Sequence, residues 1–238
     1  MNLAIAHTDP AALIERCQVT GVRIAGGEPE YEDGAVLPSG LWRPLTGETA
    51  ARLKPTTDTS DSTLVELIRL PDGPPPTSLA GLADPLGDPD AVHLGQAASP
   101  AEALTTTPNY QDGRRIGLHI DNWDKLDHHA KHTGRRRLCI NLGPGTRYLL
   151  LGDTDIQTIC RTIHHDPASR YPHTDDLRAY IAGGHQFSVY RLRLEPGEGY
   201  VAPTELLPHD GSTEGQLLPS TATFWLGHWP RGVLPALV

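Results

Sequence analysis

Alternation of apolar and polar residues is the clearest regularity in this chain, and it is strongest in the second half. Gln186–Leu194 alternates between apolar and polar residues over most of its length, which predicts a long strand. Further strands are predicted at Thr63–Leu70, Arg115–Asp121, Arg136–Leu142, Thr146–Leu151, Tyr200–Ala202 and Thr221–Trp229, with a short one at His209. Short strands joined by tight Gly-Pro and Pro-Gly turns predict a mainly β (α+β) jelly roll with a few flanking helices.

Three short helices are predicted among these strands. Asp9 is a suitable N-cap for the first, which has a proline in its first turn. The second covers residues 153–163, with Asp153 or Thr154 as its cap, and the third covers residues 174–181. None of them is long enough to form a core of its own, so we expect them to flank the sheets.

The chain is predicted to fold as one domain over residues 1–238, with its jelly-roll core in residues 111–231. Residues 1–110 are expected to be a loop-rich, mixed segment that packs on this barrel. The proline-rich run 71–76 stops regular structure, and at most short strands are expected between it and residue 110. Some of these loops are expected to fold over the mouth of the barrel.

Composition supports a turn-rich β fold and narrows the choice of partners. Only 38% of the 238 residues are apolar, whereas 24 are glycine and 22 are proline. The formal net charge of −9 disfavours a nucleic-acid partner, and the short basic run Arg135–Arg137 does not change that. We therefore expect a small-molecule ligand, and the oligomeric state stays open.

The three cysteines and the apolar runs bear on location. Cys17, Cys139 and Cys160 are an odd set without CxxC spacing, which is typical of a reducing compartment. No segment approaches 18 consecutive apolar residues, and the first residues do not have the pattern of a signal peptide. The expectation is a cytoplasmic protein without a membrane partner.

One predicted strand carries a histidine and an aspartate two residues apart, at His119 and Asp121. Residues i and i+2 of a strand point to the same face, so both side chains can reach one metal ion. The preferred third ligand is His209, far along the chain next to proline-rich turns. Two histidines and one carboxylate leave open coordination positions, which is the arrangement that non-haem iron(II) uses.

Other histidines and another metal compete with this assignment. His185 precedes a strand and His228 lies on the final one, so either could replace His209. The charged run Asp124–Arg137, which contains three histidines at 128, 129 and 132, is interpreted as a solvated loop. Zinc suits the same ligands, but the chain has no His-Glu-x-x-His sequence to supply a hydrolytic base.

The order of these residues resembles that of the iron(II) and 2-oxoglutarate-dependent oxygenases, over roughly residues 115–231. In that superfamily an early strand of a double-stranded β-helix carries His-x-Asp and a late strand carries a lone histidine, as His119, Asp121 and His209 do here. The resemblance implies Fe(II), 2-oxoglutarate as cosubstrate, dioxygen, and oxidation of a small molecule, amino acid or peptide in bacterial biosynthesis. The carboxylate at Asp121 favours hydroxylation over halogenation, which in that superfamily requires this ligand to be missing.

The superfamily also implies a buried cation for the far carboxylate of 2-oxoglutarate. Many members have an arginine about ten residues after the second histidine, but here that position falls near Pro219-Ser220. Arg147, on the strand after the Gly-Pro-Gly turn, is the preferred substitute, and Arg231 is the alternative. Hydrogen-bonding helpers are expected at Asn141, Tyr148 and Ser212.

A substrate pocket is expected around the metal, lined by polar residues beside the ligands and by large aromatic residues. Its candidate members are Asn122, Trp123, Glu205, Asp210 and Trp225. Two other functions stay open. One is a cupin-like metal-dependent dioxygenase or isomerase that does not use 2-oxoglutarate, and the other is a metal-free jelly-roll binding domain with structural histidines.

Overall fold

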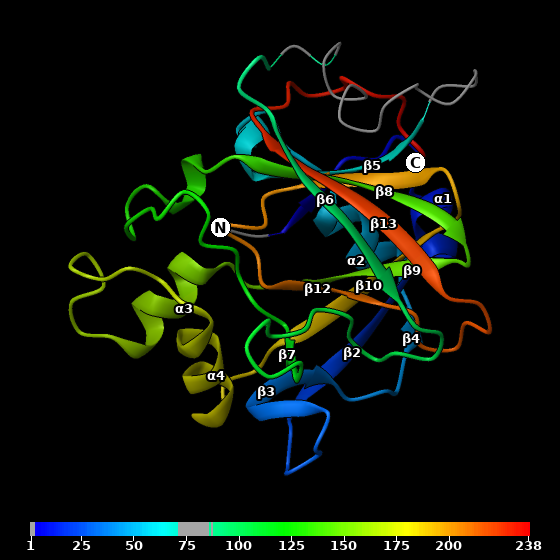
Figure 1. The fold of residues 1–238 in the computed structure, drawn as a ribbon. Coiled ribbons are helices and arrows are strands. Elements are labelled where there is room, and N and C mark those ends of the chain that lie inside the picture. The colour runs from blue at the N-terminus through cyan, green and yellow to red at the C-terminus, as the bar shows by residue number, and fades with distance from the viewer. Residues whose placement is uncertain (1–2, 71–85, 87) are drawn as a thin grey trace.

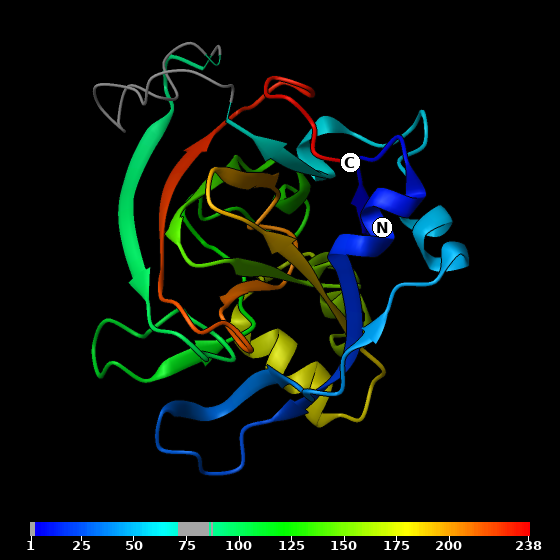
Figure 2. The same ribbon diagram turned by 90° about the vertical axis from the view of Figure 1, so that its right-hand side faces the viewer.

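The fold is mainly β, with two sheets that face each other and nearly close into a barrel (Figures 1 and 2). This architecture comes from a computed structural model that describes residues 3–70, 86 and 88–238. It confirms the predicted fold class, because it is compatible with a jelly roll that has flanking helices. The proline-rich run 71–76 lies outside the described residues.

The first sheet has the strand order β1-β5-β11-β8-β13-β6. Its strands β1 and β5 run parallel, and the other neighbours run antiparallel. The bounds are β1 Ala4–Ile5, β5 Leu64–Arg69, β6 Val92–Ser99, β8 Arg136–Pro144, β11 Glu198–Ala202 and β13 Ser220–Gly227.

The second sheet has the order β12-β9-β10-β2-β3-β7, with β4 paired to β2. All its described pairs are antiparallel except β3 with β7. The bounds are β2 Cys17–Ile24, β3 Tyr31–Pro38, β4 Arg43–Pro44, β7 Arg115–Gly117, β9 Arg147–Gly152, β10 Ser188–Leu194 and β12 His209–Ser212.

The first hundred residues form part of the barrel itself, which differs from the expected segment packed on its surface. β2 lies between β10 and β3 in the second sheet, and β5 lies between β1 and β11 in the first. β6 is also longer than the short strands expected there, because it pairs with β13 over almost its whole length. The sequence of β6 has no clear alternation, so its strand structure depends on this long-range pairing.

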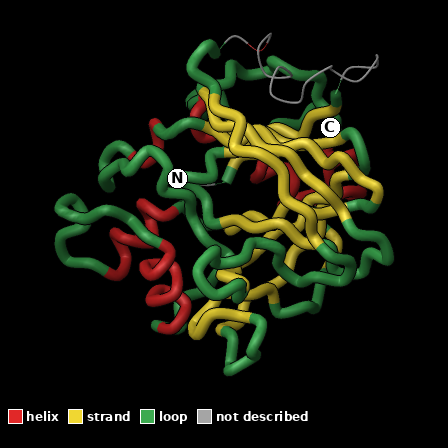
Figure 3. Tube along the Cα trace, viewed as in Figure 1, coloured by secondary structure: helices red, strands yellow, loops and turns green. Residues whose placement is uncertain are grey.

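The helices lie outside the barrel (Figure 3). α1 (Pro10–Arg16) starts as predicted, with the Asp9 side chain accepting a hydrogen bond from the backbone N–H of residue 11. α2 (Gly47–Leu53) was not predicted, and α4 (Thr174–Ala182) was. α3 (Ile156–Ile163) is capped by Asp155 and not by the residues just before it. No helix within the described ranges combines the length and apolar character that crossing a membrane requires.

Alternate residues of β9 face two different cores, and this alternation orients the functional side chains. Leu149 and Leu151 lie in the core inside the barrel with Cys139 of β8 and Tyr200 of β11. Leu150 lies in a second core between the sheet and helices α3 and α4. Successive side chains of a strand point to opposite faces, so Arg147 faces the barrel interior and Tyr148 faces outward.

Candidate metal centre

The chain segment that carries the first candidate ligand starts where β7 ends. β7 stops at Gly117, which has φ +72°, a conformation that disfavours other residues. A Cβ atom at this position would also lie 2.6 Å from the carbonyl oxygen of Val36. The strand is therefore shorter than predicted, and the following residues turn away from β3 toward β12.

His119 and His209 lie directly opposite each other as an isolated antiparallel bridge. The backbone N–H of His119 donates to the His209 carbonyl at 3.0 Å, and the His209 N–H donates back at 2.8 Å. Directly opposed residues point their side chains to the same face, so the two rings lie side by side with centroids 4.5 Å apart. Backbone pairing thus joins residues that are distant in sequence.

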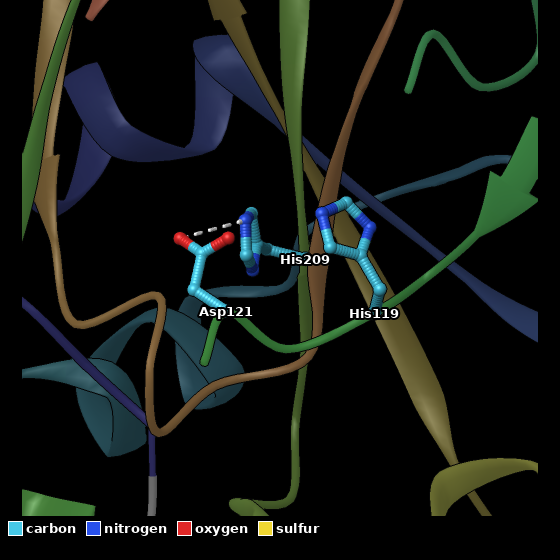
Figure 4. Close-up of side chains that lie close together, drawn as sticks. All are labelled: His119, Asp121 and His209. Carbon is cyan, nitrogen blue, oxygen red and sulfur yellow. Dashed lines mark ion pairs between the residues drawn. The ribbon is translucent and has the colours of Figure 1, made fainter. Parts of the chain in front are cut away.

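Asp121 completes the group (Figure 4). Its backbone N–H donates to the carbonyl of Thr204 at 2.9 Å, and its Oδ2 lies 3.8 Å from Nε2 of His209. One ligand atom from each of His119, Asp121 and His209 lies within 4.8 Å of the other two, and all three residues are buried. The structure therefore brings together the three residues that the sequence nominated.

Hydrogen bonds to backbone carbonyls fix the orientation of both imidazoles. Nδ1 of His119 lies 2.9 Å from the carbonyl oxygen of Gly117, and Nδ1 of His209 lies 3.1 Å from that of Leu207. Because a carbonyl only accepts hydrogen bonds, each Nδ1 must donate, which leaves the Nε2 lone pair free in the neutral ring. Metal-binding histidines usually show this outer hydrogen bond.

Charges around the group keep its ligands ready to bind a cation. Burial, reinforced by the neighbouring His119, lowers the pKa of His209 to about 3, so its imidazole is neutral near pH 7. Burial alone would raise the pKa of Asp121, but Arg137 and the two imidazoles outweigh it and hold that pKa below its usual value. Nη2 of Arg137 lies 2.7 Å from Oδ2 of Asp121.

The donor set fits a divalent metal ion. Nε2 of His209 is buried without a hydrogen-bond partner, whereas Oδ2 of Asp121, 3.8 Å away, is paired with the Arg137 guanidinium. Buried polar atoms are rarely left unpaired, so Nε2 of His209 indicates a ligand at this point. Two imidazoles and one carboxylate suit iron(II) and also zinc.

In a second group of potential metal ligands, the side chains already form hydrogen bonds with one another. Cys160, His164 and Asp176 also place one donor atom each within 4.8 Å of the others. Here, however, Nε2 of His164 contacts Oδ1 of Asp176 at 2.6 Å, and Oδ2 of Asp176 accepts the backbone N–H of His173. These atoms satisfy one another while capping α4, so the group needs no metal.

The Arg147 side chain points into the barrel interior, as the alternation of side chains along β9 requires. It is only 4% exposed, and its Nη1 is buried without a hydrogen-bond partner. Gly211, next to a candidate ligand on β12, makes room for it, because a Cβ atom there would collide with the Arg147 guanidinium and Thr106. A buried guanidinium with an unpaired nitrogen is a strong site for a carboxylate.

Tyr200, Cys139 and Arg137 surround the same interior, and the sequence analysis missed all three in this role. Burial raises the pKa of Tyr200 well above its usual value, although the positive charges of Arg137 and Arg147 oppose this rise. Burial also raises the pKa of Cys139, so the thiol stays protonated. The alternation of β8 and β11 could have placed these side chains inside, but only with the strand pairing known.

The three proposed helpers of Arg147 do not reach it. Tyr148 faces outward, where its ring lies 4.7 Å from the guanidinium carbon of Arg191. The Asn141 side chain donates to backbone carbonyls at Gly145 and Leu194, which stabilises the turn after β8. The Ser212 hydroxyl donates to a backbone carbonyl at residue 103. All three have structural partners, so their predicted role in cosubstrate binding is not supported.

Arg231 and two of the proposed pocket residues also lie elsewhere. Arg231 is exposed beyond the end of β13. Trp225 is buried in a third core, on the outer face of the first sheet, because register on β13 turns it away from the barrel. Trp123 is 54% exposed in the loop after Asp121. Neither tryptophan lines the barrel interior.

The remaining pocket candidates, Asp210, Glu205 and Asn122, have hydrogen-bond partners near the candidate metal ligands. Asp210 follows His209 on β12, so its side chain points to the opposite, outer face of the strand. There its Oδ1 accepts a hydrogen bond from Thr107, and its Oδ2 lies 3.9 Å from Nδ1 of His119. Burial raises the pKa of Asp210. Glu205 and Asn122 both bind the ammonium group of Lys131. All three residues therefore have partners within the protein.

The rival histidines and the charged loop are also placed by the structure. His185 and His228 are exposed, so neither replaces His209. The expectation of a solvated loop over Asp124–Arg137 is wrong for several of its residues, because Lys131, Arg136 and His128 are buried. The charged sequence alone does not indicate that these residues are buried, because each is buried against a partner that is distant in the sequence.

The fold and the site together define a class: a nearly closed β-barrel protein with a candidate two-histidine, one-carboxylate metal centre. No model of a known protein family matches the chain, and no curated protein matches its sequence. The functional argument therefore depends on the geometry of the site.

Proposed function

We propose that this protein is an iron(II) and 2-oxoglutarate-dependent oxygenase that hydroxylates a small-molecule, amino-acid or peptide substrate. One observation carries the proposal: the triad, in which Nε2 of His209 is buried and unpaired, faces the same barrel interior as Arg147, whose Nη1 is buried and unpaired. A metal and a carboxylate-bearing cosubstrate are the ligands that would satisfy both.

Each residue then has a defined role. His119, Asp121 and His209 hold the iron, and their arrangement leaves positions for cosubstrate and dioxygen. Arg147 binds the far carboxylate of 2-oxoglutarate. The bound iron supplies the activation of dioxygen that amino-acid side chains cannot provide.

The protein contributes orientation and exclusion of water. Apolar residues such as Leu149 and Leu151 surround the polar groups inside the barrel. In this low-dielectric interior the attraction between Arg147 and a carboxylate is stronger than in water. The neutral imidazole of His209 and the ionised carboxylate of Asp121 present their lone pairs without first losing a proton at neutral pH.

Anaerobic titration with iron(II) and then 2-oxoglutarate tests the proposal. Chelation of iron by 2-oxoglutarate is expected to produce a weak visible charge-transfer band. Arg147→Gln should raise the 2-oxoglutarate concentration needed for half of the band by roughly 100-fold, the cost of about 3 kcal/mol for a lost buried charge-assisted interaction. Arg231→Gln is the matched control, because Arg231 is exposed and should leave the titration unchanged.

Other outcomes identify the alternatives. Metal binding without the band would favour a cupin-like metal enzyme that does not use 2-oxoglutarate. Failure to bind iron(II), cobalt(II) or zinc would leave a binding domain with structural histidines. An equal loss in both arginine variants would contradict the role given to Arg147.

A further inference from the structure

A lysine is completely buried behind the candidate metal centre. The Lys131 side chain is 0% exposed, and that of its partner Glu205 is 1% exposed. Nζ of Lys131 donates to Oε2 of Glu205 at 2.6 Å, to Oδ1 of Asn122 at 2.6 Å and to the backbone carbonyl of Asp121 at 3.2 Å. All three protons of the ammonium group therefore have an acceptor.

These acceptors belong to the two segments that carry the metal ligands. Asp121 and Asn122 follow His119, whereas Glu205 precedes His209. The carbonyl of Asp121 is held by Lys131, and its N–H is held by the carbonyl of Thr204, the residue next to Glu205. The peptide groups on both sides of the Asp121 side chain are thus fixed to the segment that leads to the second histidine.

Stability alone does not explain this arrangement. Removing an ammonium and a carboxylate from water costs several kcal/mol per ion, and apolar replacements of a buried ion pair are often neutral or stabilising. What a three-acceptor ammonium group provides is a fixed geometry. That geometry is imposed at the candidate ligand that lies outside both the named strands and the His119–His209 bridge.

We propose that Lys131, with Glu205 and Asn122, is a positioning group that holds the Asp121 carboxylate in its metal-binding orientation. The proposal rests on the metal centre of the proposed function and does not require 2-oxoglutarate. Loss of this positioning group should weaken metal binding by changing the orientation of Asp121, since Lys131 itself does not contact the metal.

The test measures cobalt(II) affinity and thermal stability of the full chain in parallel. Lys131→Met combined with Glu205→Met removes both charges together, so no uncompensated charge stays buried. We expect this double variant to bind cobalt(II) about 10 to 100 times more weakly than the wild type, the usual cost of losing an outer contact of a metal ligand. Its visible cobalt spectrum should change as well, since the spectrum reports ligand geometry.

A second buried ion pair offers a matched control. Arg136 and Glu66 lie 2.9 Å apart on the outer face of the first sheet and are both buried, but they contact none of the three ligands in the part of the chain described. Arg136→Met with Glu66→Met should alter thermal stability and leave cobalt affinity and spectrum unchanged.

Three outcomes decide the proposal. Wild-type cobalt affinity and spectrum in the folded Lys131 and Glu205 double variant would overturn it. If that variant does not fold, Asn122→Ala serves in its place, because Asn122 is exposed and the substitution removes one acceptor of Lys131. An unchanged cobalt spectrum in Asn122→Ala would then overturn the proposal. Absence of cobalt binding in the wild type would show a failure of the metal centre itself, which is distinguishable because the variants would then have nothing to lose.

Discussion

At the scale of single residues, the state of two lone pairs decides what this site can do. His119 and His209 each donate through Nδ1 to a backbone carbonyl, so each offers Nε2 to the barrel interior. Asp121 is kept ionised by Arg137 beside it. Two candidate ligands that are already deprotonated, His209 and Asp121, release no proton when a metal binds at neutral pH.

The lowered pKa of His209 predicts how the metal-free protein responds to acid. Its pKa of about 3 lies below the ordinary value of 6.5, so below pH 6.5 the unfolded chain takes up a proton that the folded protein does not. Stability should therefore fall as pH falls from 6.5 toward 3, at up to about 1.4 kcal/mol per pH unit from this group. Urea unfolding between pH 7 and pH 5 measures it.

His209→Gln supplies the comparison for this pH dependence, because glutamine does not titrate. The slope of unfolding free energy against pH should be smaller in the variant over the same window. Equal slopes in the variant and the wild type would show that His209 is not buried as a neutral imidazole.

The sequence nominated the three candidate ligands, which the structure brings together, and Arg147, which it places inside the barrel, but not Arg137, Tyr200 or Lys131. The ligands were recognisable because a short His-x-Asp motif and a late histidine have a familiar order. The missed residues depend on strand pairing and on which face a side chain occupies. Lys131 in particular lies in a charged run, where only its contact with distant Glu205 shows that it is buried.

At the scale of elements, two glycines set where the site can form. Gly117 ends β7 and redirects the chain toward β12, while Gly211 on β12 leaves space for the Arg147 guanidinium. β12 thus serves two purposes: it supplies a candidate ligand at His209, and two residues later Gly211 leaves room for the Arg147 guanidinium.

Gly211→Ala tests this second purpose. The added methyl group would collide with the Arg147 guanidinium and with Thr106, so both must shift. We expect a loss of stability of about 1 to 3 kcal/mol from overpacking, with weaker 2-oxoglutarate binding and retained iron(II) binding. Isothermal titration with each ligand and thermal unfolding measure the three effects.

Gly26→Ala is the control for this substitution, since a Cβ atom there meets nothing within 4 Å. It should leave the binding of both ligands and the stability close to wild type. Unchanged 2-oxoglutarate affinity in a folded Gly211→Ala variant would argue against Arg147 as the anchoring cation.

Element boundaries were predictable where the signal is local. The cap at Asp9 and the end of β10 at Leu194 agree with the sequence patterns. β7 stops earlier than its apolar pattern indicates because Gly117 adopts a positive φ against β3, and β6 exists through its pairing with β13. Such long-range constraints leave no local trace in the sequence.

At the scale of the whole molecule, the barrel is assembled from strands of both halves of the chain (Figure 2). β2 pairs with β10, β5 pairs with β11, and β6 pairs with β13. The second half of the chain contains the three candidate ligands. In both sheets, however, its strands pair with strands from the first half. The metal centre therefore depends on the first hundred residues for its scaffold.

A fragment of residues 111–238 should accordingly fail to fold, because it would expose unpaired strand edges and the inner core. Circular dichroism and amide hydrogen exchange are expected to show an unfolded or aggregating chain. A monomeric fragment with protected amides that binds iron(II) would contradict this and would support a separate barrel in the second half.

The central claim is that the two imidazoles and the carboxylate share one metal ion. A crystal structure of the iron-loaded protein, with anomalous diffraction recorded at the iron absorption edge, tests it most directly. The account predicts one strong peak about 2.0 to 2.2 Å from Nε2 of His119, a carboxylate oxygen of Asp121 and Nε2 of His209. A peak at other side chains, or none at these three under iron-saturating conditions, would contradict it.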